Sequence, residues 1–251
     1  VVLVSTLLVY VAIPASPNLV VEDLDTGIFF VLAVSSLSVI GVLMAGWASA
    51  NKYSLIGALR AAGQLIAYEL PLVLGVVIQA GTLSLNGIVF AQADGEIFGW
   101  GGIGNPFILT QIVGFVIFLA AVQAELTQPP FDMPVAESEI VGGYQVEYSG
   151  FRFLLFFLAE FATAFAFAAI ASVLFLGGWA VPWLDTSSDW YYVLGPIVLF
   201  AKVMIVSFII FWVRFTYPRF REDQLQSFAW KVLIPVSLLN ILVTGVLKVV
   251  L

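Results

Sequence analysis

Long apolar runs separated by polar loops constrain this chain more than any other feature. The runs cover approximately Val1–Pro14, Ile28–Ala50, Gln64–Ala80, Pro106–Ala124, Phe151–Leu176, Trp190–Phe215 and Ala229–Leu251. Most have the ~20 residues that a helix needs to cross a hydrocarbon core of ~30 Å, whereas membrane strands would be about 10 residues long and alternating. The sequence therefore predicts an all-α, polytopic transmembrane helix bundle of about seven spans, forming a single domain over residues 1–251.

The composition excludes several classes of protein and site. Hydrophobic residues make up 62% of the 251 residues and charged residues only 10%, against about 25% charged in soluble domains, so lipid must cover much of the surface. Cysteine and histidine are both absent. The chain alone therefore has no disulfide, no thiolate-bound iron–sulfur cluster and no histidine-bound haem or zinc. A net charge of −7 argues against nucleic-acid binding.

The charges in the loops predict an orientation. One set of loops carries the basic residues Lys52, Arg60, Arg152, Arg214, Arg219, Arg221 and Lys231. The other set carries the acidic residues Glu22, Asp23, Asp25, Asp94, Glu96, Asp185 and Asp189, with Lys248 as its only basic residue. Basic loops remain on the cytoplasmic side of a membrane, so we expect a multi-pass protein of a bacterial or organelle inner membrane with its basic loops in the cytoplasm or its equivalent.

The polar segment Ala124–Phe153 is the richest in chemistry. Its carboxylates are Glu125, Asp132, Glu137, Glu139 and Glu147, set against the single base Arg152. Crowded carboxylates repel one another, which raises some of their pKa values. Prolines 129, 130 and 134 stop a helix, after which residues 136–148 are predicted to form a short one. Two interpretations remain open: a solvated acidic loop with Asp132 as a helix N-cap, or the wall of a cavity or subunit interface.

Three ionisable residues interrupt the apolar runs. Glu69, Glu160 and Lys202 would each cost about 2.5–3.5 kcal/mol at the middle of a span. Such residues face the interior of a bundle or water, and they often mark ion pathways. A static Lys–Glu pair that fixes helix packing is the alternative. Pro71, close to Glu69, is expected to disturb its helix and to free backbone carbonyls.

Three polar segments together carry a resemblance to the NADH dehydrogenase subunit 1 family of complex I. In the acidic segment the matching residues are Glu125, Pro130, Phe131, Asp132, Pro134, Ala136, Glu137, Glu139, Val141, Gly143, Tyr144 and 147–150. A second block matches at 46–47, 52–53, Gly57, 59–60, Gln64 and 68–69. A third matches at Arg214, 218–219, Arg221, 223–225 and 230–231. Glu160 and Lys202 also occur where the family tends to carry them, so the resemblance covers essentially the whole chain.

The resemblance implies a membrane subunit of a proton-pumping NADH:quinone oxidoreductase that supplies no redox centre itself. Such subunits line the quinone chamber of this respiratory-chain translocase and couple quinone reduction to proton transport. NADH, FMN and iron–sulfur clusters belong to partner subunits of the membrane and peripheral arms. The implied proton-coupling residues are Glu69, Glu125, Asp132, Glu137, Glu139, Glu147, Glu160 and Lys202. The implied residues of the quinone chamber or subunit interface are Arg60, Tyr68, Phe131, Tyr144, Arg152, Arg214, Arg219 and Arg221.

Some features depart from the family pattern. The family commonly has Arg at the position of Gln128 and Glu at that of Val135, so the acidic loop here carries less charge. The chain also opens on VVLVSTLLVYVAIP without a Met, from which we expect an N-terminally incomplete sequence that lacks the family's first span.

Two other functions remain as alternatives. One is the homologous subunit of a membrane-bound hydrogenase-type complex, against which Pro130–Asp132 and the run Glu147–Gly150 favour the quinone branch. The other is an independent proton-coupled transporter. Internal repeats and matching broken helices would be expected of it, and the sequence has no obvious repeat.

Overall fold

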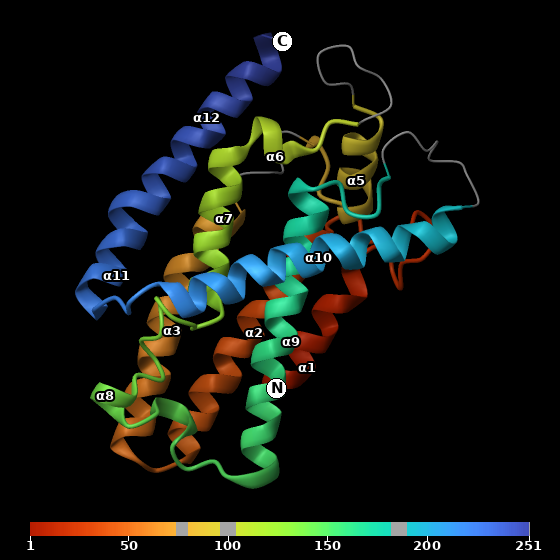
Figure 1. Ribbon diagram of the computed structural model, residues 1–251. Coiled ribbons are helices and arrows are strands. Elements are labelled where there is room, and N and C mark those ends of the chain that lie inside the picture. Colours follow the sequence, from red (N-terminus) through yellow and green to blue (C-terminus); the bar gives the residue numbers. More distant parts are fainter. Residues whose placement is uncertain (74–79, 96–103, 182–189, 251) are drawn as a thin grey trace.

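The computed structural model describes residues 1–73, 80–95, 104–181 and 190–250, and these fold almost entirely into helices (Figure 1). The longer elements are α1 (Val2–Val9), α2 (Gly27–Ala48), α3 (Lys52–Val73), α5 (Leu85–Ala93), α7 (Ile112–Glu125), α9 (Gly150–Phe175), α10 (Tyr191–Thr216) and α12 (Ile234–Val250). The shorter elements are η1 (Tyr10–Ala12), α6 (Phe107–Thr110), α8 (Glu137–Ile140), η2 (Gly143–Gln145), α11 (Glu222–Phe228) and the π-helical turn η3 (Ala229–Leu233). The prediction of an all-α fold is confirmed.

The predicted count of seven spans is not confirmed. Among the described residues, four helical stretches are long and apolar enough to cross a membrane: Gly27–Ala48, Gly150–Phe175, Tyr191–Thr216 and Glu222–Val246. The apolar run at 106–124 divides at Gln111 into α6 and a 14-residue α7, which extends only about 21 Å. The run predicted from Gln64 begins earlier, at Lys52, because polar residues of the preceding loop join the helix. The predicted loop residues Glu96, Asp185 and Asp189 lie outside the described residues.

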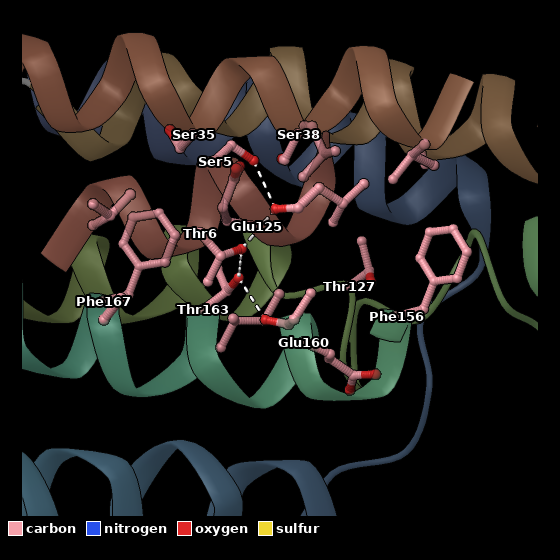
Figure 2. A pocket seen from close by; sticks show the side chains of 18 of the residues that line it. Ser5, Thr6, Ser35, Ser38, Glu125, Thr127, Phe156, Glu160, Thr163 and Phe167 are labelled. Carbon is pink, nitrogen blue, oxygen red and sulfur yellow. Dashed lines mark hydrogen bonds between the residues drawn. The ribbon is translucent and has the colours of Figure 1, made fainter. Parts of the chain in front are cut away.

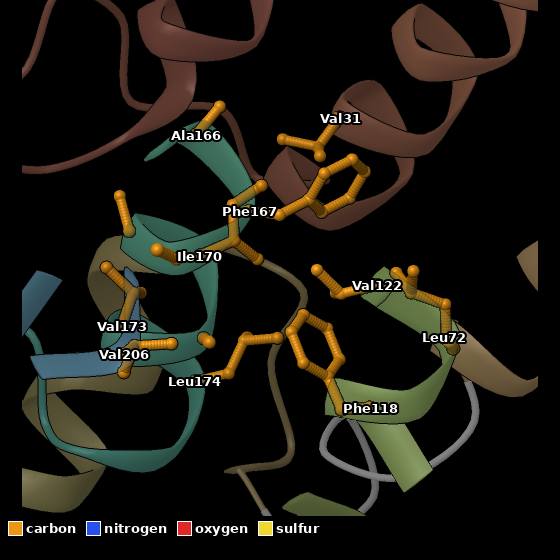
Figure 3. Close-up of a cluster of buried hydrophobic side chains, with 14 of the residues drawn as sticks. Val31, Leu72, Phe118, Val122, Ala166, Phe167, Ile170, Val173, Leu174 and Val206 are labelled. Atoms are coloured by element: carbon orange, nitrogen blue, oxygen red, sulfur yellow. The ribbon is translucent and has the colours of Figure 1, made fainter. Parts of the chain in front are cut away.

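The core lies where α3, α7 and α9 meet, with α2 alongside. Figure 3 shows Phe118 and Val122 of α7 facing Phe167, Ile170 and Leu174 of α9. The facing stretch of α9 contains many alanines, which let neighbouring helices approach closely where lipid supplies no hydrophobic driving force. Van der Waals contact among these side chains therefore holds the bundle together.

The acidic segment departs from its predicted conformation. The helix expected over residues 136–148 is broken into α8 and η2 by Val141 (φ 59°) and Gly142 (φ 107°), both of which adopt the left-handed conformation. The residue that precedes α8 is Ala136, so the interpretation of Asp132 as its N-cap is wrong. The loop after α7, together with α8 and η2, packs against α3 at the end of the bundle remote from α5 and α6 (Figure 1).

Gly57 on α3 makes this close packing possible. A Cβ atom at Gly57 would lie 2.6 Å from the Cα of Gly143 and 2.9 Å from the carbonyl oxygen of Pro134. Both are backbone atoms, so they cannot rotate away as a flexible side chain would. The acidic loop can therefore pack directly on α3 only because residue 57 is a glycine and has no Cβ atom.

Gly57→Ala should therefore destabilise the folded protein by about 1–3 kcal/mol, the usual cost of overpacking. Gly63→Ala on the same helix is the matched control, because a Cβ there meets only the side-chain amide of Gln226 at 3.9 Å. Thermal unfolding of the purified protein in detergent measures both, and limited proteolysis reports release of the loop. Equal melting temperatures for the two variants would show that the loop backbone does not pack tightly against Gly57.

Candidate functional site

Two carboxylates lie inside the helix bundle. Glu125 ends α7 and is buried, while Glu69 lies in the part of α3 that packs on α7. Each has one buried carboxylate oxygen without a hydrogen-bond partner in the described structure, and the two side chains are near enough to repel each other. Buried polar atoms normally find partners, so these unpaired oxygens mark a place where water or a proton would be bound.

Gln64 ties the end of α7 to the acidic loop. Its amide Nε2 donates to the carbonyl oxygens of Ala124 (2.6 Å) and Phe131 (2.8 Å). Phe131 in turn packs edge-on against Tyr68, with ring centroids 5.6 Å apart, and the Tyr68 hydroxyl donates to the Leu225 carbonyl at 2.9 Å. The loop that follows α7 is thus drawn into the protein.

Asp132 is the loop carboxylate most ready to change its charge. Burial raises its pKa to about 6; Arg219 opposes this shift, and the negative charge of Glu160 adds to it. A carboxyl with such a pKa is mostly ionised at pH 7, yet a modest change in local potential protonates it. Of the predicted site residues outside the membrane spans, Asp132 best fits a proton acceptor.

Glu160 on α9 lies in a polar junction with two donors from other segments. Its Oε1 accepts from the amide of Gln128 at 2.9 Å and from the Arg214 guanidinium at 3.4 Å. Arg214 also lies over the ring of Phe161, 5.7 Å from its centroid. The sequence predicted Glu160 and Arg214 separately, and the structure brings them together.

Glu139 holds a different role, because it is the centre of an ion cluster. It pairs with Arg60 of α3 at 2.5 Å and with Arg219 at 2.8 Å, and Arg60 also reaches Glu222 of α11 at 3.1 Å. The hydrogen bond from Arg60 holds the pKa of Glu139 below its ordinary value. Glu139 therefore stays ionised and fastens α8 to α3 and to the segment between α10 and α11.

Apart from the buried Tyr144, the remaining predicted loop residues lie toward the protein surface or make local contacts. Glu137 is exposed, and Glu147 accepts a hydrogen bond from Asn51 at 2.6 Å. Tyr144 is buried, which raises its pKa to about 12. Arg152 is exposed at the start of α9, and Arg221 pairs with Asp223 at 3.2 Å, where both side chains are more than three-quarters exposed. Such a surface pair contributes little to stability.

Lys202 is not brought together with the carboxylates. Its Nζ donates to the carbonyl oxygens of Gly178 and Ala180, each at 2.9 Å, beyond the end of α9. The sequence left two interpretations of Lys202 open, a residue of an ion pathway and one member of a static Lys–Glu pair. These contacts show neither, because Lys202 pairs with backbone carbonyls rather than with a glutamate. The contact fixes residues 178–180 beyond the end of α9.

A cavity of about 70 Å³ adds a group of residues that the sequence did not single out (Figure 2). Glu125 and Glu160 both line it, together with the hydroxyls of Ser5, Thr6, Ser35, Ser38, Thr127 and Thr163. Gln128, which bonds Glu160, stands out in the sequence only as a departure from a family pattern. Scattered hydroxyls in apolar runs carry no distinctive sequence signal, because many bond only to their own helix.

Comparison with known proteins places the chain in a family. A family model described as NADH dehydrogenase matches residues 1–245. A subunit of the NADH-quinone oxidoreductase of Brevibacillus brevis is 47% identical over 241 residues, covering 95% of this chain and 68% of that relative. The corresponding NADH-quinone oxidoreductase subunits of Anoxybacillus flavithermus and Dehalococcoides mccartyi are each 46% identical, and the chain covers 69% and 64% of their lengths. The chain therefore belongs to the NADH dehydrogenase family that includes these NADH-quinone oxidoreductase subunits.

Proposed function

We propose that this chain is the quinone-site membrane subunit of a proton-pumping NADH:quinone oxidoreductase. It would line the quinone chamber with partner subunits and pass the charge change of quinone reduction to its buried carboxylates. The observation that carries the proposal is the sequence of acidic groups from the loop into the bundle: Asp132, Glu160 beside Gln128 and Arg214, then Glu125 and Glu69. Membership of the family supplies the reaction and the partners.

The physical mechanism follows from electrostatics. Electrons delivered by clusters of partner subunits make the quinone negative, and a nearby negative charge raises the proton affinity of a carboxylate. Asp132, with a pKa of about 6, would respond first, because it is half-buried and takes part in no ion pair among the described residues. Asp132 and Glu160 interact electrostatically, and Glu125 and Glu69 form a second such pair. Their proton binding is therefore coupled in pairs rather than independent.

The basic residues around α8 would serve the subunit interface. Arg60 and Arg219 form the inner cluster with Glu139, and Arg221 and Lys231 lie on the exposed side. Exposed bases with apolar neighbours such as Phe215 and Tyr217 suit docking of the peripheral arm. We assign Glu139, Arg60 and Arg219 to holding this surface in shape, and Asp132 to charge transfer.

Asp132→Asn should lower quinone reduction and proton pumping together by at least about tenfold, while reduction of the iron–sulfur clusters by the donor is preserved. Wild-type activity should also decline as the pH falls below about 6, because Asp132 then already holds its proton. The Asp132→Asn variant, although slower, should not show this decline of activity at low pH. Asp223→Asn, which changes an exposed carboxylate of α11 that pairs with Arg221 at the surface, is the matched control. Normal pumping by an assembled Asp132→Asn complex would refute the coupling role.

Glu69→Gln and Glu125→Gln keep the shape of each side chain and remove its charge. Both should impair quinone-linked turnover and pumping while electron transfer to an artificial acceptor remains, because the peripheral arm is untouched. Asp223→Asn, at an exposed carboxylate outside the bundle, is again the control. If both interior variants reduce quinone and pump at the wild-type rate, Glu69 and Glu125 are only structural.

The proposed orientation can be tested with single cysteines, since the natural chain has none. Ser149 and Glu22 are both exposed and lie in loops of opposite charge. Ser149→Cys should react with an impermeant thiol reagent from the cytoplasm and Glu22→Cys from the opposite side. The reverse labelling pattern would overturn the orientation.

A further inference from the structure

Gln64 on α3 is fully buried, and its side-chain amide bonds two separate points of the neighbouring chain. Its Nε2 atom donates to the carbonyl oxygen of Ala124 at 2.6 Å and to that of Phe131 at 2.8 Å. The first carbonyl belongs to the peptide group that leads into Glu125, and the second to the peptide group that leads into Asp132. One side chain therefore holds the backbone immediately before both of these carboxylates.

The backbone between these two attachment points forms a closed turn. The side-chain amide of Gln123 donates to the carbonyl oxygen of Pro129 at 2.8 Å, and the N–H of Phe131 donates to the carbonyl oxygen of Gln128 at 2.8 Å. The ends of the turn lie at the two carbonyl oxygens that Gln64 bonds. The Gln64 side chain therefore fixes the distance across the turn.

Gln64 is not needed to satisfy these two carbonyl oxygens. That of Ala124 also accepts from the N–H of Thr127 at 3.1 Å, and that of Phe131 accepts from the N–H of Met133 at 3.0 Å. The Oε1 atom of Gln64, by contrast, is buried without a partner among the described residues, and such an atom lowers stability. The position in which Gln64 holds the chain therefore explains this amide better than a gain in stability does.

The same face of α3 also holds the ring of Phe131. Tyr68 lies one helical turn after Gln64, and its ring meets that of Phe131 edge-on. From the segment after α10, Phe220 packs its ring 5.5 Å from that of Phe131, and its N–H donates to the carbonyl oxygen of Pro130 at 2.9 Å. The backbone and the ring of Phe131 are both fixed, so the residue that follows it has little freedom to move.

The position of Asp132 decides which charges and how much solvent it meets. Burial has the largest influence on its pKa and favours the neutral carboxyl. Its charged neighbours are Arg219, Glu160, Arg214 and Glu137. The two arginines favour the ionised carboxylate, and the two glutamates favour the neutral form. If the backbone before Asp132 moved toward solvent, the influence of burial would weaken and the pKa of Asp132 would fall.

We propose that Gln64 is a positioning residue, whose amide fixes the backbone before Glu125 relative to the backbone before Asp132 and so keeps Asp132 in its half-buried place. It acts only through the main chain, since both of its hydrogen bonds go to backbone carbonyls. Its importance for turnover rests on the proposed function, in which Asp132 responds to the charge on the reduced quinone.

Gln64→Met in the assembled complex removes both donors while nearly preserving the length and volume of the side chain. Because each carbonyl keeps a backbone donor, the variant should fold and assemble. Its backbone amides over residues 126–133 should exchange with deuterium about tenfold faster than in the wild type, since the bonds that close this turn onto α3 are lost. Unchanged exchange in this stretch would show that Gln64 does not hold the turn, and would overturn the proposal.

Gln92→Met is the matched control for loss of a buried glutamine. Gln92 lies on α5, at the end of the bundle remote from the loop (Figure 1). It is also buried, and its Nε2 atom donates to two backbone carbonyls, that of Val173 at 2.8 Å and that of Ile88 at 3.3 Å. Exchange over residues 126–133 should match the wild type in this variant. Equal acceleration in both variants would indicate a general loosening of the bundle and would overturn the proposal.

The pH profile shows whether the position of the turn matters for function. In Gln64→Met, Asp132 should become more solvated, so its pKa should fall from about 6 toward the ordinary value of an aspartate. The decline of activity at low pH should then begin about one pH unit lower than in the wild type, and turnover at neutral pH should fall by about tenfold because the carboxylate is misplaced. A decline at the wild-type pH, despite faster exchange, would overturn the positioning role.

A double variant distinguishes this proposal from the proposed function. If Gln64 acts through Asp132, Gln64→Met should cause no further loss of pumping when it is added to Asp132→Asn. Losses that multiply would overturn the positioning role. Normal pumping by Asp132→Asn alone would instead refute the proposed function, and the exchange of residues 126–133 would still decide whether Gln64 holds the turn.

Discussion

Lipid offers no hydrogen bonds, so each polar group inside this bundle depends on partners within the protein. This constraint organises the interior. Gln64 holds the carbonyls of Ala124 and Phe131, Lys202 holds two carbonyls beyond α9, and Gln128 holds Glu160. Buried oxygens of Gln64, Gln128, Glu69 and Glu125 nonetheless lack a partner among the described residues. Of these, only the carboxylate oxygens of Glu69 and Glu125 can take up a proton and so change their charge.

The short α7 brings the chemistry of the loop into the bundle. Because α7 ends after 14 residues at Glu125, the chain that follows starts deep in the protein rather than at its surface. Phe131 and Met133 are buried and Asp132 is half-buried as a result. The same segment thereby holds a titratable carboxylate, an apolar anchor and the connection to the interior, which together allow a change at the loop to affect Glu125.

The surroundings of the loop carboxylates divide them into two kinds. One kind stays ionised and holds the loop in position, and the other can change its charge. Glu139 lies between Arg60 and Arg219 and keeps its charge. Asp132, four residues after Gln128, lies between acidic and basic neighbours, and burial raises its pKa to about 6. An acidic loop needs both, because a segment that responds to charge must first be held in position. Gly57 provides that position by allowing the backbone of the loop to lie directly on α3.

The sequence by itself determined the all-helical membrane class, the family and the identities of Glu69, Glu125, Asp132 and Glu160 as candidates. Apolar length, the ionisable residues within it and dense family motifs are local signals that one chain displays fully. The tertiary structure decided which of these residues meet: Glu160 with Gln128 and Arg214, Glu139 with Arg60 and Arg219, and Lys202 with backbone carbonyls. It also broke the helix expected over residues 136–148 and placed Glu125, Glu160 and several hydroxyl side chains on the lining of one cavity. Contacts between distant segments depend on the packing of helices, and no local pattern in the sequence encodes that packing.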